Sequence, residues 1–489
     1  MYSVVVIGAG LAGIAAAARL RAAGITDFVI LERADRVGGV WRDTVYPGAE
    51  VDVPSWLYSL SFAAKPDWTK VNAGAPEILA YIEDVVQRLG ISPHLRFDSE
   101  VVRAEYGTGY WTVATANGES VHARTVIAAD GVLSNARYPT LEGMETYAGQ
   151  RILSSRWPAG MDVTGRRIAV VGTGASAAQI VPALVARAAH VTVFQRTPAW
   201  ALPRPDTDVP APVQSLFAEF PVAQRMLRWL LFLIYELLLV GATNLGPLTT
   251  FFEAVSRRHL RTQVHDPDLR AALTPTYRIG CKRPLVTSTF YPALQQENCT
   301  LVPHAVVGLT ADGLTAADGS HHAADCVVFA TGYDVHNRGA AFTVIGRDGR
   351  VLADEWRDGM VGYKSVSVAG YPNLFWAMGP NSFGHSSLLL FIEEQVDYAV
   401  RCIREILDND ISEFDVRPAA QARFNERLQR KLRTTTFGSG CHSWYLNPSG
   451  QNCTAFPGSV TAYRRQMRVL DLHDYVTVPA PGRIPQVMS

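Results

Sequence analysis

The fold of this chain is decided by the stretch Ser3-Val4-Val5-Val6-Ile7-Gly8-Ala9-Gly10-Leu11-Ala12-Gly13. Its β-branched residues predict a short strand, and the alanine-rich run over residues 11–23, closed by Gly24, predicts a helix. A second apolar run, Phe28-Val29-Ile30-Leu31, stops at Glu32. Because strand, glycine-rich turn, helix, strand and acid follow in this order, the stretch predicts the first unit of a Rossmann-like domain.

The glycines of this turn suit a phosphate group. Gly8 permits the tight turn, Gly10 lets the backbone approach a pyrophosphate, and Gly13 lets helix and strand pack closely. The helix N-terminus offers unpaired N–H groups and the positive end of its dipole. Glu32 lies 24 residues after Gly8, near the distance at which an acid binds a ribose hydroxyl. The stretch therefore predicts a dinucleotide site; the alternative is an ordinary buried turn.

A second dinucleotide pattern begins at residue 167. Its strand, Arg167-Ile168-Ala169-Val170-Val171, leads into Gly172-Thr173-Gly174-Ala175-Ser176-Ala177, with alanine in the third glycine position. The next strand, residues 190–194, is followed by Arg196 where an acid would otherwise stand. Since an acid repels a 2′-phosphate and an arginine can pair with it, this site is predicted to prefer NADPH to NADH. The alternative is that Arg196 is a plain surface charge.

Two nucleotide sites in one chain need an explanation. A duplicated scaffold with one empty site is one possibility, but both turns keep the glycines that phosphate approach requires. Electron transfer from a nicotinamide to a flavin is the simplest use of both sites.

Composition places the chain among ordinary globular proteins. Its 489 residues allow two or three domains, and its formal net charge of zero argues against charge-driven binding of nucleic acid. Six cysteines without a C-x-x-C pair favour a reducing, cytoplasmic setting, and the early strand leaves no room for a signal peptide. His321-His322 is interpreted as a solvated turn, and no metal-ligand spacing is present.

One apolar run bears on membranes. Residues 229–240 are almost wholly apolar, but the run is shorter than the roughly 20 residues that a spanning helix needs, and Glu236 interrupts it. We therefore expect no integral membrane segment and predict a buried or groove-facing helix. Peripheral contact with a membrane surface is the alternative.

Three further segments carry a resemblance to a known family. They are Asp35-Arg36-Val37-Gly38-Gly39-Val40-Trp41, Tyr46-Pro47-Gly48-Ala49-Glu50-Val51-Asp52 and Tyr58-Ser59-Leu60-Ser61-Phe62. Here the sequence resembles the class B flavoprotein monooxygenases, specifically their Baeyer–Villiger branch, and the resemblance extends over almost the whole chain.

The resemblance implies an α/β fold with two Rossmann-like dinucleotide-binding domains, one for FAD and one for NADPH. Residues 1–145 would form the first FAD-binding segment, and residues 146–336 the NADP-binding domain with a helical insertion at about 203–270. Residues 337–489 would complete the FAD-binding domain and supply a C-terminal loop that covers the cleft.

The same resemblance implies the residues that contact the cofactors. For FAD they are Gly8, Gly10, Ala12, Gly13, Glu32, Arg33, Gly39, Val40, Trp41, Asp52, Tyr58 and Asn381. For NADPH they are Gly172, Gly174, Ser176, Ala177, Gln179, Arg196, Thr197 and Lys282.

The family chemistry needs a fixed cation. Its reduced flavin reacts with O2 to give a C4a-peroxyflavin, whose attack on a ketone yields an ester or lactone. By resemblance Arg283 is the cation that stabilises the negative charge, Asp52 orients it, and Trp444 lines the substrate side. The alternatives are a surface salt bridge for Arg283, a turn cap for Asp52 and a core aromatic for Trp444. Trp444, Tyr445, Phe456 and the apolar run suggest a fairly apolar small-molecule carbonyl substrate.

One signature residue differs from the family. The family runs F-x-G-x-x-x-H-x-x-x-W, whereas this chain has Tyr147 at the phenylalanine position and Leu153 at the histidine position, with Trp157 unchanged. The histidine acts in the linker between domains, so its loss puts coupling between nicotinamide oxidation and oxygenation in doubt. An N- or S-oxygenating monooxygenase of the same fold, or an uncoupled NADPH oxidase, are the competing hypotheses.

Overall fold

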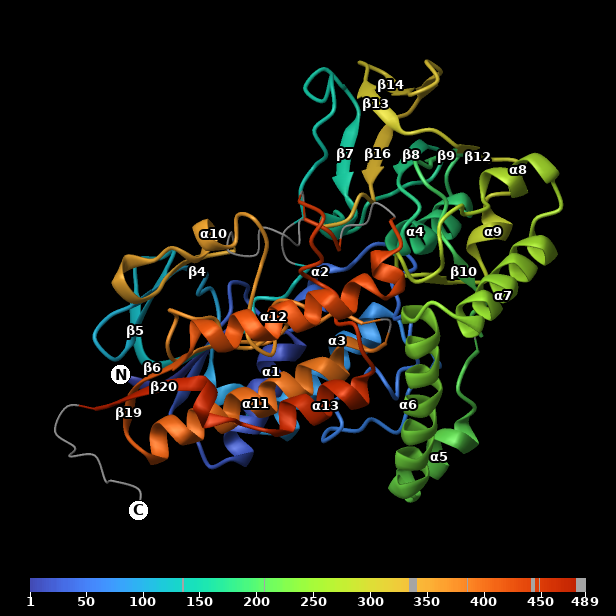
Figure 1. Cartoon of the computed structure of the whole chain (residues 1–489). Helices are drawn as coiled ribbons and strands as arrows, with labels where there is room; N and C mark the ends of the chain where they lie inside the picture. The colour runs from blue at the N-terminus through green and yellow to red at the C-terminus, as the bar shows by residue number, and fades with distance from the viewer. Residues whose placement is uncertain are drawn as a thin grey trace.

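The computed structural model describes residues 1–133, 136–205, 207–333, 341–384, 386–440, 445–447 and 449–480. Two large β-sheets organise this part of the chain, and each packs its own apolar core (Figure 1). The polypeptide passes from the larger sheet to the smaller one and then returns.

The larger sheet has eight strands in the order β17-β4-β5-β6-β1-β2-β3, with β18 beside β6. β1 pairs in parallel with β2 and β6, as a Rossmann-like unit requires, and its Val4, Val5 and Val6 are fully buried because parallel sheets are covered on both faces. The strands are β1 (Tyr2–Ile7), β2 (Phe28–Leu31), β3 (Leu95–Arg96), β4 (Val101–Tyr106), β5 (Trp111–Thr115), β6 (Ser120–Ala128), β17 (Thr343–Ile345) and β18 (Leu374–Trp376).

Both ends of the chain build the core beside this sheet. α1 (Leu11–Ala22), formed by the alanine-rich run, packs against α11 (Leu388–Asp408), so the blue and orange helices lie side by side in Figure 1. Small alanine side chains allow this close approach, and α11 supplies larger residues such as Phe391 and Val396.

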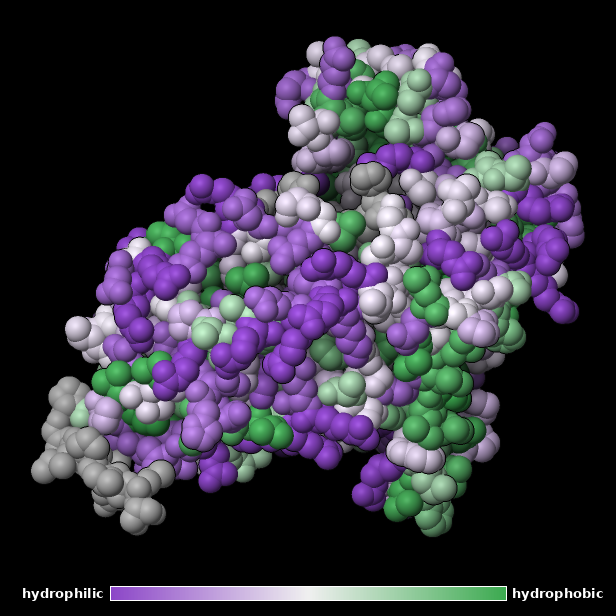
Figure 2. Space-filling view, viewed as in Figure 1, coloured by the Kyte–Doolittle hydropathy of each residue, from purple (hydrophilic) through white to green (hydrophobic). Residues whose placement is uncertain are grey.

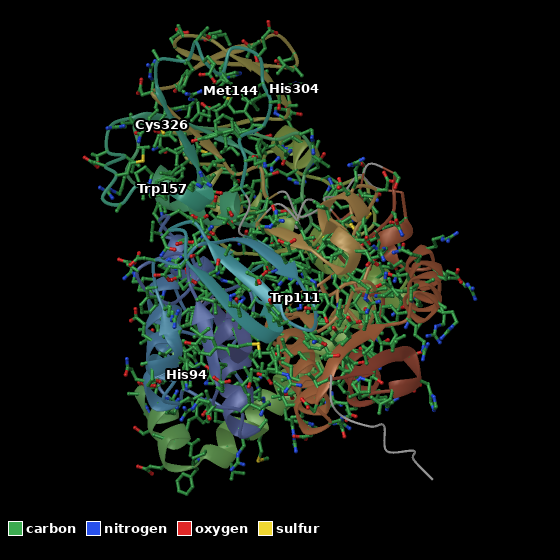
Figure 3. All side chains as sticks on the ribbon, turned by 90° about the vertical axis from the view of Figure 1, so that its left-hand side faces the viewer. His94, Trp111, Met144, Trp157, His304 and Cys326 are labelled. Carbon is green, nitrogen blue, oxygen red and sulfur yellow. The ribbon has the colours of Figure 1, made fainter. Side chains whose placement is uncertain are left out.

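The smaller sheet is wholly parallel, in the order β12-β9-β8-β16-β7. Its strands are β7 (Gln150–Leu153), β8 (Arg167–Val171), β9 (His190–Phe194), β12 (Cys299–Val302) and β16 (Cys326–Phe329). Figure 3 shows Trp157 and Cys326 in this unit, apart from Trp111 in the larger sheet. Leu153 ends β7 and is 3% exposed in an apolar cluster, so it is a core residue.

The remaining helices and strands surround these sheets. The helices are α2 (Val40–Asp43), α3 (Ala75–Arg88), α4 (Ala175–Val185), α5 (Ala211–Glu219), α6 (Pro221–Thr243), α7 (Pro247–Gln263), α8 (Pro267–Ala272), α9 (Phe290–Ala293), α10 (Leu352–Glu355), α12 (Pro418–Arg433) and α13 (Val460–Arg468). The smaller strand sets are β10 (Ala201–Leu202) with β11 (Leu285–Val286), β13 (Val306–Leu309) with β14 (Gly313–Ala316) and β15 (His321–Ala323), and β19 (Ile411–Val416) with β20 (Tyr475–Pro479).

Three sequence interpretations need correction. The apolar run belongs to a longer helix, α6, and one side of that helix is exposed instead of buried, because only its other side meets the rest of the chain. His321 and His322 lie in strand β15, where the antiparallel ladder with β14 takes their backbone out of a turn. Cys281 is disulfide-bonded, which the absence of a C-x-x-C pair did not suggest.

Candidate active site

The first glycine turn has the shape that a pyrophosphate requires. Gly8 has φ +101°, a left-handed conformation that glycine adopts without strain. A Cβ on Gly13 would lie 1.9 Å from the Gly8 carbonyl oxygen, so only glycine lets α1 approach the turn. α1 begins after Gly10 with no side-chain cap, and the backbone of Gly39 approaches Gly10 closely. This cradle fits FAD phosphates.

Glu32 has an additional structural role. It is 4% exposed, and its Oε2 accepts the Ala9 N–H at 2.8 Å, inside the glycine turn. Its Oε1 accepts from Arg42 Nη1 at 2.8 Å and from the Ala34 N–H at 3.1 Å. The carboxylate thus holds the turn and α2 together, and the predicted ribose contact would use its remaining lone pairs.

The segment after β2 places aromatic rings near the first turn. Trp41 in α2 donates its Nε1–H to the Tyr58 hydroxyl at 3.0 Å, and the two rings meet edge to face. Burial raises the pKa of Tyr58 to about 12, so the phenol keeps its proton even at alkaline pH. Val40 is 37% exposed, and Arg33 donates to Asp43 at 3.3 Å.

The second glycine turn repeats this geometry. Gly172 has φ +114°, and Gly174 precedes α4, where a Cβ would meet open space. Ser176 and Ala177 lie in the first turn of α4, which also has no side-chain cap. The turn therefore fits a second set of phosphates. Gln179, further along α4, accepts from the Tyr46 hydroxyl at 2.8 Å and donates to the Glu50 carbonyl at 2.9 Å, so it joins the two nucleotide units.

Two cations meet beyond β9. Burial lowers the pKa of Lys282, and the positive charge of Arg196 lowers it further, so these side chains lie near each other. Arg196 is exposed, and Thr197 follows it, with its carbonyl accepting from the Thr173 hydroxyl at 3.4 Å. Two neighbouring positive charges can hold an anion, and the predicted 2′-phosphate of NADPH is one such group.

The centre of the site is an ion pair between Asp52 and Arg283. Arg283 donates its Nε–H to Oδ2 at 2.9 Å and its Nη2–H to Oδ1 at 3.1 Å, while Nη1 donates to the Gly384 carbonyl at 3.2 Å. The side chains are 27% and 32% exposed for Arg283 and Asp52. Burial lowers the pKa of Arg283, but Asp52 outweighs this effect and the net pKa is raised. The guanidinium is thus a permanent, oriented cation.

Two further tyrosines flank this pair. Burial raises the pKa of Tyr235, on α6, and of Tyr445 to about 12, and both values also respond to the charges of Asp52 and Arg283. Tyr445 also hydrogen-bonds the backbone of Arg283. Sequence reasoning missed Tyr235 as a site residue, because nothing in an apolar helical run marks which side chain faces a distant charge.

Two further residues, Asn381 and Trp444, were predicted to contact the flavin and to line the substrate side. Asn381 donates both amide hydrogens to backbone carbonyls, of Asn452 at 2.9 Å and Ala455 at 3.0 Å, so its side chain positions the C-terminal segment. Its contact with FAD stays a prediction. Trp444 lies outside the described residues. Within the described part of the chain, no three His, Cys, Asp or Glu side chains gather as metal ligands would.

Comparison with known proteins agrees with this geometry. The family described as pyridine nucleotide-disulphide oxidoreductase matches residues 5–220. A Baeyer–Villiger monooxygenase of Streptomyces coelicolor is 42% identical over 98% of this chain and 94% of its own length, and one of Pseudomonas aeruginosa is 37% identical over 98% and 92%.

Solved structures lead to the same group. Cyclohexanone monooxygenase from Rhodococcus sp. Phi1 bound to NADP+ superposes with a TM-score of 0.88 at 27% identity, over 98% of this chain and 99% of that one. Oxidized steroid monooxygenase bound to NADP has a TM-score of 0.87 at 28% identity, over 98% and 100%. The chain therefore belongs to the Baeyer–Villiger branch of the class B flavoprotein monooxygenases, which are FAD- and NADPH-dependent enzymes.

Proposed function

We propose that this chain inserts one oxygen atom from O2 next to a ketone carbonyl, giving an ester or lactone, and that Arg283 is its catalytic cation. The observation that carries the proposal is the bidentate pair of Asp52 and Arg283, joined from distant parts of the chain. When bound, FAD reduced by NADPH supplies the activated oxygen.

The residues of the chain supply a fixed electrostatic environment. Attack on a ketone carbonyl places negative charge on its oxygen, and the Arg283 guanidinium stabilises charge that the neutral ketone does not carry. Asp52 and the Gly384 carbonyl hold the guanidinium plane, so little reorganisation is needed when the charge develops. An enzyme that oxygenates amines or thioethers has no such oxyanion to stabilise, which favours the ketone reaction.

The nicotinamide preference rests on a separate part of the site. We infer that Arg196, Thr197 and Lys282 bind the 2′-phosphate of NADPH; the closeness of the Arg196 and Lys282 charges, and the position of Thr197 next to Arg196 in the chain, support this. An arginine can bind a phosphate through two parallel N–H donors, and Lys282 adds a point charge.

We propose a division of the chain that follows its sheets. Residues 1–145 and 337–489 supply the eight-stranded sheet and would form the FAD-binding domain. Residues 146–336 supply the parallel five-stranded sheet and would form the NADP-binding domain, with α5 to α8 as its insertion at about 203–270.

The surroundings of Arg283 support a fairly apolar carbonyl substrate. Tyr58, Tyr235 and Tyr445 lie near this arginine, and burial raises the pKa of each to about 12, still further above physiological pH than an ordinary phenol. Aromatic faces with neutral hydroxyls suit a small ketone with one polar end. A cytoplasmic location is part of the same proposal: the absence of a C-x-x-C pair favours it, whereas the disulfide at Cys281 does not.

The test is product analysis with a panel of apolar ketones, amines and thioethers under 18O2. Arg283→Ala should lower ester formation by a factor of roughly 100 to 1,000 while FAD stays bound. NADPH should still be consumed slowly, with hydrogen peroxide released. Arg278→Ala is the matched control, because Arg278 pairs with Glu253 in the same segment away from Asp52. Ester formation by Arg283→Ala at a near wild-type rate would refute the role.

The competing function, an uncoupled NADPH oxidase, is favoured by one observation, which is the leucine at position 153. It stands where the family signature has histidine and is buried among apolar residues, so it offers no proton-transfer group there. Measuring hydrogen peroxide and ester per NADPH consumed in the wild-type enzyme distinguishes the two functions. Peroxide in near-stoichiometric amounts with every ketone would favour the oxidase.

A further inference from the structure

Helix α6 is held to the rest of the chain along one side. Gln224 donates to the Lys65 carbonyl at 2.7 Å, and Arg228 donates to the Ser59 carbonyl at 2.9 Å. The Glu236 carboxylate accepts the first two N–H groups of α13, at 2.9 and 2.8 Å. By length and composition α6 is the one helix of the described residues that could cross a bilayer, but these bonds hold its polar groups against the protein.

The opposite side of α6 is an exposed apolar seam. Met226, Leu230, Leu233, Leu237 and Val240 follow one another at intervals of four and three residues and are 67%, 50%, 41%, 59% and 37% exposed. This spacing repeats every 3.5 residues on average, as in the contact stripe of a coiled coil. Figure 2 shows the seam as part of a continuous apolar column over α5 and α6 at the edge of the molecule.

The inner side of the helix is apolar as well. Leu231, Phe232, Tyr235 and Leu239 pack against the core beside the larger sheet. A helix that is apolar on all sides is normally covered on all sides. The seam therefore needs an occupant that is absent from a single chain.

The exposed area is large enough for a stable interface. Trp229 and Ile234 adjoin the seam and are 63% and 45% exposed. If a fully exposed large apolar residue shows about 200 Å², the seam and these two residues together expose roughly 700 Å² of surface. The largest apolar patch of a typical monomer is about 300–600 Å². A standard protein interface buries about 800 Å² on each partner, which is close to this value.

Charge distinguishes a protein partner from a lipid surface. α6 has three charged residues, and two of them, Arg228 and Glu236, bind the chain's own backbone. The outer side thus carries at most the single charge of Arg225, and the chain has no net charge. Helices that lie on anionic membranes carry several basic residues, so this seam suits an uncharged apolar partner better.

We propose that the seam is the interface of a homodimer in which α6 packs antiparallel against α6 of a second copy. A self-complementary twofold contact is the commonest closed arrangement of identical chains. Leu233, at the middle of the seam, lies at the twofold axis, and Met226 faces Val240 of the second copy. The antiparallel direction also places the two Arg225 side chains at opposite ends, where they do not repel each other.

The test is sedimentation velocity of the full-length, FAD-loaded enzyme across a dilution series. The wild type should sediment as a dimer, and Leu233→Glu and Leu233→Lys should each be monomeric, with dimer dissociation constants raised roughly 100-fold or more. An equimolar mixture of the two variants should restore a dimer, because opposite charges then meet at the axis. Val307→Glu, at a 50% exposed site in β13, is the matched control and should remain dimeric. Bound FAD in each variant reports folding.

Several outcomes would overturn the proposal. They are a wild type that is monomeric at every concentration, or seam variants that stay dimeric. A monomeric wild type that floats with phosphatidylcholine–phosphatidylglycerol vesicles, while Leu233→Glu does not, would identify a lipid surface as the occupant and also overturn it.

Discussion

Replacing Asp52 with asparagine should slow ester formation roughly 10- to 30-fold without removing FAD. The carboxylate accepts two N–H groups of Arg283, at 2.9 and 3.1 Å, whereas an asparagine amide has only one oxygen to accept them. Losing one charge-assisted hydrogen bond costs about 1.5–3 kcal/mol. Because both side chains are about 30% exposed, we expect the lower part of that range, about 1.5–2 kcal/mol.

The pH dependence of this loss identifies the role of Asp52. Removing the carboxylate takes away the interaction that raises the pKa of Arg283, but a guanidinium keeps its proton at any physiological pH. The loss should therefore be equal at neutral and at mildly alkaline pH. If Asp52 acted as a general base, the loss would change with pH instead.

The assay measures ester by gas chromatography together with NADPH consumption and flavin absorbance. Glu253→Gln is the matched control, because Glu253 also pairs with an arginine, Arg278, but lies elsewhere. An Asp52→Asn rate within about twofold of the wild type would refute the orienting role.

Three further predictions follow from other parts of the structure. Arg196→Ala should raise the KM for NADPH much more than that for NADH, because it removes a cation from the predicted phosphate site; equal changes in steady-state kinetics would contradict this. Gly13→Ala should purify without the yellow flavin colour, since its Cβ would lie 1.9 Å from the Gly8 carbonyl oxygen, while Gly246→Ala, with open space around its Cβ, should stay yellow. Burial lowers the pKa of His259, whose Nε2 donates to the Thr287 carbonyl at 2.9 Å. The unfolded chain therefore binds a proton at this imidazole more readily than the folded protein does, and the folded state loses stability as the pH falls below the unfolded pKa of about 6.5. The Tm should drop over that range, and less so in His259→Gln; identical Tm profiles for both proteins would show that His259 is not responsible.

Residues with local constraints could be recognised from the sequence alone. A turn that needs the left-handed backbone of Gly8, and a helix that can approach only where Gly13 lacks a side chain, are steric demands of neighbouring residues. Short continuous apolar runs rich in β-branched residues likewise specify the buried strands Tyr2–Ile7 and Arg167–Val171. These local patterns were sufficient to predict the α/β fold and the two nucleotide turns. The catalytic assignment of Arg283 came instead from family resemblance.

Contacts between distant segments were decided only by the tertiary structure. No spacing shows that Asp52 binds Arg283 through two hydrogen bonds, that Lys282 lies near Arg196, or that Tyr235 lies near the same ion pair. Exposure is decided in the same way. The apolar run of α6 looks much the same on every side, and its outer side is exposed because the inner side packs on the core, where Arg228 and Glu236 also bind the rest of the chain. Burial depends on which faces meet when the chain is folded, and that information is distributed over the whole sequence.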